Sequence, residues 1–526
     1  MDNYLTLTKV FFLSGISTNR KANSQRPVFK QLGIMAAVFT AISLFYNFTM
    51  FKAVDAAAEG ALGVYRDILL FVLTIASFFT VVMTFNQMQT ALFNSKDFEF
   101  VESLPVKSST VIAAKITSVL VYCIGEDIII FLPTVVLYLV FTGDVFVSAL
   151  GLIAMFFVSL VPLLVSSLLG TLVALLTKKL KKKNVFQIIV YLMYFILAFS
   201  VSFSINGSSF VNRAEIAKAM PHLLLFKNAV YNHNVLSFLL FIGVNLAAFA
   251  AVVAVISLLY KPINSIRERT GGGGYKEVRS GGSKLAMILI KKDLKMLTGK
   301  PNYFINSIFG SILYPIYSIM FMFMNNANSD GGKFLGVMVL TIPVMGIIMN
   351  SITNSTLASI SLEGKSFENL LSYPVSSKEI IRSKIRVGFF VPSIISIVGS
   401  SLILVMLGVK NVLGGLTWPT LAAIYLAPQF ALMYASVTGM LCNLRWPKIH
   451  FENEIQVIKN SRSALFGMLF IFLPGMVAGG IVFVLNFISP LASLIALAAV
   501  YTAMVLTSTM ILKKHEEKLF AAVIAK

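Results

Sequence analysis

The sequence predicts an all-α polytopic membrane protein with about 12 transmembrane helices, arranged as two parallel six-helix repeats with pseudo-two-fold symmetry. Hydrophobic residues make up 57% of the chain and charged residues only 12%, whereas a soluble domain carries about 25% charged residues. The mean hydropathy of +0.85 agrees with this class. Apolar runs of membrane-spanning length recur along the chain, and a polar stretch between two of them occurs twice. These observations exclude an ordinary globular protein.

Twelve apolar runs are long enough to cross a bilayer, because a membrane-spanning helix needs about 20 mostly apolar residues. In the first half of the chain the spans are predicted near 31–51, 67–92, 113–141, 145–176, 185–205 and 235–260. In the second half they are predicted near 303–324, 334–358, 385–407, 416–442, 463–486 and 490–512. The run 145–176 is long and contains Pro162, a residue that kinks helices.

Basic residues are concentrated in alternate loops, as in membrane proteins that keep positive charge on the cytoplasmic side. The richer set of loops contains the basic run 178–183, the segment 261–300 and both termini. Both termini and both copies of the repeated stretch are therefore predicted in the cytoplasm, in a multi-pass protein of the cell membrane, surrounded by lipid. The net charge of +21 follows from this loop pattern, so no nucleic-acid partner is expected.

The repeated stretch relates the two halves of the chain at a constant offset of 269 residues. Residues 96–116 match 365–385 at nine positions, including Phe98 with Phe367 and Lys115 with Lys384. A single register of this length indicates an internal duplication. The predicted organisation is a first six-span half (1–260), a glycine-rich cytoplasmic linker (261–284) and a second six-span half (285–526). Each half opens on an amphipathic segment suited to the membrane interface, at 4–13 and 285–297.

Each copy of the stretch predicts a helix of two turns with one apolar face. That face carries Phe98, Val101 and Leu104 in the first copy, and Phe367, Leu370 and Tyr373 in the second. Pro105 and Pro374 end these helices, because proline has no N–H to donate. In the second copy Ser376 and Glu379 form a capping box that starts the next span. Such a helix either closes a loop or transmits a push from the cytoplasm to the spans.

The chain has no Walker A motif, since Ser359 stands where the first glycine is required before Gly364, Lys365 and Ser366. No catalytic residue, metal site or bound cofactor is expected in it, so the energy for any transport must come from elsewhere. Glu126 and Asp127 lie near the middle of the third predicted span. An ionisable group at that depth is a candidate for the translocation path or a proton site. The alternative is an acidic pair that is hydrogen-bonded or protonated inside the bundle.

The segment from Glu363 to Lys384 resembles the "E-G-K-x-F-x-x-L-x-S-x-P-V-S-x-x-x-I-x-x-S-K" phrase of ABC-2 type ABC exporter membrane subunits. The first-half copy is weaker, with Asn94 and Ser95 in place of Glu363 and Gly364. The resemblance implies that residues 96–104 and 365–373, with Glu99 and Glu368, are coupling helices that dock on two copies of a separate cytoplasmic ATPase. ATP and Mg would be bound by that ATPase. It further implies a bacterial exporter whose substrate crosses between the two six-span halves.

Three classes of function remain open at this point. The leading hypothesis is the permease subunit of an ATP-driven exporter. The runner-up is a proton-coupled secondary transporter that uses Glu126 and Asp127. The third is a membrane scaffold that transports nothing. The matched pair of cytoplasmic helices favours the first class, because a proton-driven carrier needs no such pair. The sequence does not distinguish a peptide, lipid, drug or glycan substrate.

Overall fold

The computed structural model describes most of the predicted helical parts of the chain. The described residues are 2–16, several residues between 33 and 52, and 62–93, 98–177, 184–193, 221–269, 285–323, 331–352, 355–364, 366–371, 375–409, 416–449, 451, 454–459 and 461–524. Over these ranges every regular element is a helix and no strand occurs. Seven of the described helices are long and apolar enough to cross a membrane. The prediction of an all-α polytopic membrane protein is confirmed.

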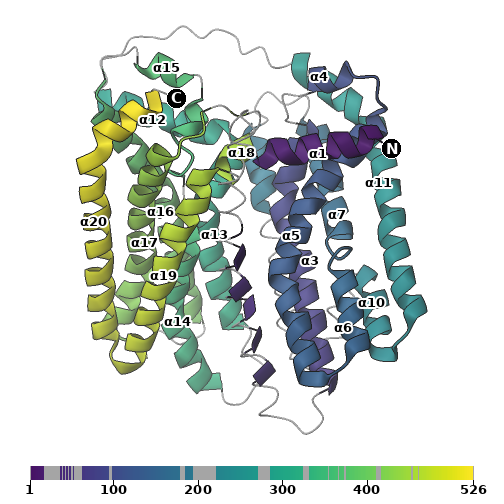
Figure 1. Ribbon diagram of the computed structural model, residues 1–526. Helices are drawn as coiled ribbons and strands as arrows, with labels where there is room; N and C mark the ends of the chain where they lie inside the picture. Colours follow the sequence, from purple (N-terminus) through teal and green to yellow (C-terminus); the bar gives the residue numbers. More distant parts are fainter. Residues whose placement is uncertain are drawn as a thin grey trace. The chain divides into compact units, whose positions relative to one another are not determined.

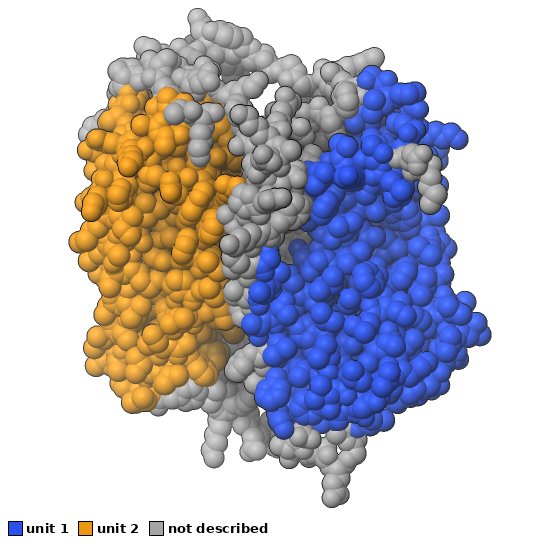
Figure 2. All heavy atoms as spheres, viewed as in Figure 1, with its two compact units in different colours: residues 1–183, 193–274 blue, residues 184–192, 275–526 orange. Residues whose placement is uncertain are grey.

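The described residues divide into two compact units, coloured separately in Figure 2. Unit 1 comprises Met1–Lys183 and Met193–Gly274, and unit 2 comprises Asn184–Leu192 and Tyr275–Lys526. The short apolar helix Asn184–Met193 contributes to unit 2 through Asn184, whose side-chain amide donates to the Gly299 carbonyl at 2.6 Å.

Unit 1 contains a helix at its start, followed by long and short helices (Figure 1). Its labelled elements are α1 (Asp2–Ile16), α3 (Leu62–Phe93), α4 (Phe98–Glu102), α5 (Ser108–Thr142), α6 (Val145–Ala154), α7 (Leu160–Thr177), α10 (Pro221–Asn232) and α11 (Val235–Arg269). The helix α1 lies across the ends of the long helices of its unit rather than beside them (Figure 1). The amphipathic segment 4–13 is therefore helical, as predicted, and part of α1.

The predicted span at 145–176 is not one continuous helix, because the run forms two helices. The helix α6 ends at Ala154, five residues in turns follow, and α7 begins at Leu160. Pro162 stands in the first turn of α7, where a missing N–H is tolerated. In a continuous helix the same proline would leave the Val158 carbonyl without its donor. The interruption next to Pro162 avoids that arrangement.

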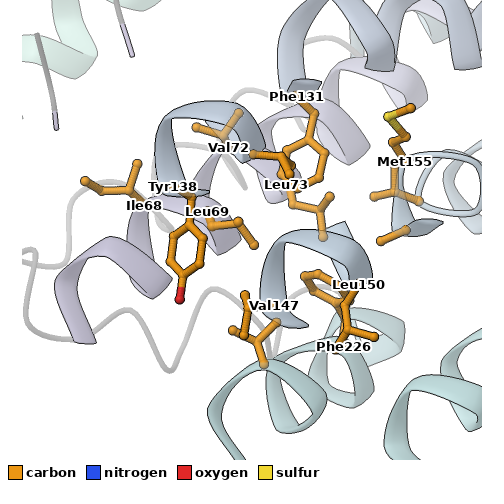
Figure 3. Close-up of a cluster of buried hydrophobic side chains, with 14 of the residues drawn as sticks. Ile68, Leu69, Val72, Leu73, Phe131, Tyr138, Val147, Leu150, Met155 and Phe226 are labelled. Carbon is orange, nitrogen blue, oxygen red and sulfur yellow. The ribbon is translucent and has the colours of Figure 1, made fainter. Parts of the chain in front are cut away.

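The core of unit 1 away from α4 joins α3, α5, α6, α10 and the start of α11. Buried side chains of these helices meet there, including Leu69, Leu73, Phe131, Leu150 and Phe226 (Figure 3). Their packing holds this part of unit 1 together.

Unit 2 also consists of helices, most of them long (Figure 1). They are α12 (Leu285–Gly299), α13 (Pro301–Phe323), α14 (Gly331–Ile352), η2 (Ser361–Glu363), α15 (Ser366–Leu371), α16 (Ser377–Val409), α17 (Trp418–Arg445), α18 (Glu454–Ile458), α19 (Arg462–Ile488) and α20 (Pro490–Ile524). The starts of α14 and α16 follow those of α3 and α5 by the 269 residues of the sequence repeat. The capping box before α16 is confirmed, since the Glu379 carboxylate accepts from the Ser376 hydroxyl at 2.9 Å and the Ser376 backbone N–H at 3.1 Å.

The last helix of each unit continues beyond its predicted span. Spans were predicted to end near 260 and 512, but α11 runs to Arg269 and α20 to Ile524. The helix α11 thus enters the segment expected to be a flexible tether; residues 270–284 lie outside the described residues.

A proline inside α17 is accommodated by two hydroxyl groups. Pro428 has no N–H, so the Ile424 carbonyl loses its donor from within the helix. Tyr314 of α13 donates its hydroxyl to that oxygen at 2.8 Å, and Ser400 of α16 donates to it at 3.0 Å. Side chains of neighbouring helices therefore satisfy a backbone group that has no access to water, as membrane helices require.

Candidate functional site: two short loop helices and buried polar groups

The short helices α4 and α15, called the loop helices below, occupy matching places in the two units. Each follows the second long helix of the repeat register and precedes the third. The apolar face predicted for α4 is turned into its own unit, where Phe98 and Val101 are buried. The Phe98 ring lies 5.6 Å, centroid to centroid, from the ring of Tyr260, which stands on α11 where its predicted span ends. Leu104 is half-buried and Pro105 is exposed just after the helix.

The loop helix α15 is held in the same manner in unit 2. Phe367 and Leu370 are buried, and the Phe367 ring lies 5.5 Å from the ring of Phe520 on the extended part of α20. Phe520 belongs to the same buried cluster as Ile380 and Ile381 of α16. The side chains of Glu99 and Glu368, and all of Tyr373 and Pro374, lie outside the described residues.

Ion pairs support both contacts with the terminal extensions. In unit 1 the Lys261 ammonium lies 3.1 Å from a Glu102 carboxylate oxygen. In unit 2 Lys378 at the start of α16 lies 3.6 Å from Glu516 and 3.5 Å from Glu517. These pairs are partly exposed, so each adds little by itself. The apolar face of each loop helix thus anchors the helix to its own unit, and a partner has only the remaining surface to contact.

Directly beneath α15, a buried lysine joins three elements of unit 2. The Lys384 side chain is 0% exposed, and its ammonium lies 2.6 Å from Glu363 and 3.0 Å from Asp293. Its third partner is the Ser359 carbonyl at 3.2 Å. Lys384 belongs to α16, Asp293 to α12, and Glu363 ends the turn that leads into α15. This lysine network connects the loop helix to the first helix of its unit.

Two further side chains contact the carboxylates of the lysine network, one through a hydrogen bond and one through an ion pair. The Ser383 hydroxyl donates to the second oxygen of Asp293 at 2.6 Å, and Lys292 lies 2.5 Å from Glu363. Burial acts to raise the pKa of the Glu363 carboxyl, but Lys384 and Lys292 outweigh burial and hold that pKa below its usual value. Glu363 is therefore ionised at neutral pH.

The repeat partner of Lys384 is also buried in unit 1. Lys115 donates to the Ala91 carbonyl near the end of α3 at 2.9 Å and to the Tyr260 hydroxyl at 3.4 Å. Its ammonium also lies over the rings of Phe11 and Tyr260, an arrangement that attracts a cation. Lys115 therefore joins α1, α3 and α11 around the loop helix α4.

Asp127 is buried in unit 1 beside the interruption between α6 and α7. One carboxyl oxygen lies 2.5 Å from the Ser159 hydroxyl, and that hydroxyl lies 2.7 Å from the hydroxyl of Thr80 on α3. Ser159 is the last residue of the interruption. The neighbouring Glu126 is half-buried. The two acidic residues predicted as a pair thus differ in surroundings, and Asp127 is the one directed into the polar contacts.

Several residues of these sites were not predicted as site residues. Phe520 lies beyond the last predicted span, which ended near 512, and Asp293 was assigned only to an interfacial segment. Lys115 and Lys384 were recognised only as matching positions of the repeat. A signal was present, because Lys115 lies inside a predicted span and Lys384 directly before the matching one, and an ionisable residue at that place is costly without a partner.

Comparison with known proteins places the chain among membrane proteins. A family model described as "Membrane protein of 12 TMs" matches residues 25–515. The chain belongs to this family and is a multi-pass protein with twelve spans. No curated protein is similar enough to the chain to count as a match.

Proposed function

We propose that the protein is the membrane subunit of an ATP-driven ABC exporter of the ABC-2 type. In this proposal α4 and α15 are coupling helices, and each docks on one copy of a separate cytoplasmic ATPase. ATP and Mg are bound by the ATPase, and this chain catalyses no reaction. Both termini lie in the cytoplasm of a bacterial cell, and the exported substrate crosses between the two six-span halves.

The observation that supports this proposal best is the matched anchoring of the loop helices. Phe98 packs on Tyr260 and Phe367 packs on Phe520, so each loop helix is tied to the last helix of its unit. Buried Lys115 and Lys384 tie the same regions to the third long helix and its neighbours. A push on α4 or α15 would therefore reach several long helices of the same unit at once.

In this proposal the two sides of each loop helix have different roles, one in attachment to the unit and one in contact with the ATPase. The buried phenylalanine keeps the helix fixed to its unit and gives the push a rigid path. The ATPase would contact the exposed side, with Ser103 and Pro105 after α4 and Ser366 at the start of α15. ATP-dependent pairing of two ATPase copies would then move the two units between inward and outward access.

The proposal is tested by purification from the native membrane in mild detergent. The wild-type protein is expected to bring down an ATPase subunit with a Walker A motif. The variant Ser103→Trp/Ser366→Trp, which adds bulk only to the exposed sides, is expected to lose it. The control Asn232→Trp adds the same bulk to an exposed residue at the far end of α10 and should keep it. If no ATPase accompanies the wild type, or if the purified chain transports alone, the proposal is wrong.

A second candidate function rests on Asp127. A buried carboxyl at a helix interruption, which accepts from Ser159 and through it is connected to Thr80, is the kind of group that proton-coupled carriers use. In that alternative, Glu126 and Asp127 carry the coupling proton and no ATPase is needed. Transport by the purified chain that follows an imposed pH gradient would favour this function over the exporter.

A further inference from the structure

A row of exposed side chains on α16 changes from positive to apolar along the helix. Residues four apart are neighbours on a helix surface, and such a row is inclined to the helix axis, so it winds slowly around α16. The row contains seven exposed members. They are, in order, Lys378, Arg382, Arg386, Phe390, Ile394, Val398 and Leu402. The apolar members are strongly exposed, with Phe390 at 57% and Ile394 at 61%. In a twelve-span membrane protein such an exposed apolar row faces lipid.

The change of character marks the membrane boundary on this face. Four residues of helix advance about 6 Å along its axis, so the backbone of Arg386 is about one turn from that of Phe390, the first apolar member of the row. Arginine near the end of a spanning helix extends its charged group to the interface. Arg382 and Arg386 are therefore placed at the level of the lipid headgroups, one turn apart on the same side.

These two guanidinium groups are not neutralised by the protein as far as the structure describes it. Lys378, the first member of the row, is paired with Glu516 and Glu517 of α20. Arg382 and Arg386 have no ion-pair or hydrogen-bond partner among the described residues. Two adjacent unneutralised cations at headgroup level attract an anion.

The corresponding surface of α5 in unit 1 has no arginines and is packed against α1. At the repeat positions of Arg382 and Arg386 stand Ala113 and Thr117 of α5. Thr117 shares a hydrogen bond with Tyr4 of α1 at 2.7 Å, so protein covers this face. In unit 2 the first helix, α12, instead contacts α16 through Asp293 with Ser383 and Lys384. The arginine face of α16 is left open as a result.

We propose that Arg382 and Arg386 form a binding site for the phosphate of an anionic phospholipid, present on unit 2 and not on unit 1. Two guanidinium groups one turn apart can each donate two hydrogen bonds to a phosphate. The acyl chains of the same lipid would lie along the row from Phe390 to Leu402. A protein partner is disfavoured as the occupant, because the row runs directly into the lipid-facing surface.

The test is native mass spectrometry of the purified full chain, titrated with phosphatidylglycerol or with phosphatidylcholine. Arg382→Gln/Arg386→Gln is expected to weaken phosphatidylglycerol binding by about fivefold for each arginine, as expected for one basic residue at a charged lipid surface. Phosphatidylcholine binding should not change. Arg382→Lys/Arg386→Lys keeps the charge but loses the two-pronged geometry, so an intermediate affinity is expected.

The matched control is Lys107→Gln/Lys227→Gln, which removes two charges from unit 1 away from this row and should bind phosphatidylglycerol as the wild type does. Thermal unfolding and the single variant Arg386→Gln identify any folding defect. Equal phosphatidylglycerol affinity of the glutamine variant and the wild type would overturn the proposal. So would loss of a co-purifying protein with lipid binding unchanged, since the arginines would then serve that protein. The assay needs no ATPase and is independent of the exporter proposal.

Discussion

The rings of Phe367 and Phe520 pack with their centroids 5.5 Å apart, and both side chains are buried. This contact joins the loop helix α15 to the end of the last helix of the chain. The equivalent contact in unit 1 is Phe98 with Tyr260. In both units the phenylalanine of the repeat packs on an aromatic ring of the last helix. That ring belongs to a tyrosine in unit 1 and to a phenylalanine in unit 2.

Phe520→Ala is expected to loosen α15 without unfolding the long helices. Removing a buried phenylalanine costs roughly 3–5 kcal/mol, and here the loss falls on the terminal part of α20 and on α15. Amide hydrogen exchange should become faster in residues 366–371, while the spans keep their protection. The control Ile524→Ala shortens an exposed side chain of the same helix and should leave exchange unchanged. Unaltered protection of α15 in Phe520→Ala would show that the contact does not hold the helix.

Lys384→Met is expected to destabilise unit 2 strongly. The change leaves Asp293 and Glu363 buried without their shared cation, and breaking a buried pair in this way costs about 3–5 kcal/mol. Thermal unfolding in detergent measures the loss. The triple variant Lys384→Met/Asp293→Asn/Glu363→Gln removes all three charges and should recover much of the stability. Lys295→Met, at an exposed position of α12, is the control; a Lys384 variant as mild as this control would contradict the network.

Stability should fall on acidification because of Glu363. Its pKa in the folded protein lies below the usual value, so the ionised carboxylate stabilises the fold fully above the usual glutamate pKa. That stabilisation disappears as the pH falls through the lower folded pKa. The melting temperatures of the wild type and Glu363→Gln should therefore converge between about pH 6 and pH 3. A constant difference over this range would show that Glu363 is not linked to stability.

Asp127→Asn distinguishes the two functions proposed above. Asparagine keeps an oxygen that can accept from Ser159 but carries no titratable proton. In the exporter proposal the contact is structural, so ATP-dependent export by the reconstituted complex should continue at close to the wild-type rate. In a proton-coupled carrier the same change should abolish transport driven by a pH gradient. Asp127→Leu, which removes the acceptor as well, is expected to lower stability in either case.

The class of the protein and most helix positions were predictable from the sequence. Apolar runs of about 20 residues and a conserved repeat register depend on composition and spacing alone. The interruption at 155–159 was not predicted, because every residue near it is apolar or small and only Pro162 gives a signal. Whether a proline kinks a helix or ends it depends on the donors that its neighbours supply.

The partners of the site residues were less predictable. Phe98 and Phe367 were recognised from the repeat, but sequence patterns do not show whether the apolar face of a two-turn helix packs on its own unit or on a partner. Tyr260 is the last residue of its predicted span, and Phe520 lies on an extension that a hydropathy rule assigns to a loop, because Lys513 and Lys514 end the apolar run. Helix length there is decided by packing on the loop helices, which is a tertiary effect.

The two hydroxyl groups at the Ile424 carbonyl should stabilise the protein only because Pro428 lacks an N–H. Tyr314 and Ser400 both donate to this oxygen, so Tyr314→Phe or Ser400→Ala alone leaves one donor and should cost about 1 kcal/mol. Together they leave a buried carbonyl without any donor, and the combined loss should exceed the sum of the single losses. Pro428→Ala restores an N–H within α17, so in that background the excess should disappear. Thermal unfolding is measured for the wild type and for all combinations of Tyr314→Phe, Ser400→Ala and Pro428→Ala, eight proteins in total. If the losses of Tyr314→Phe and Ser400→Ala are simply additive when Pro428 is present, the two hydroxyls do not replace the missing donor.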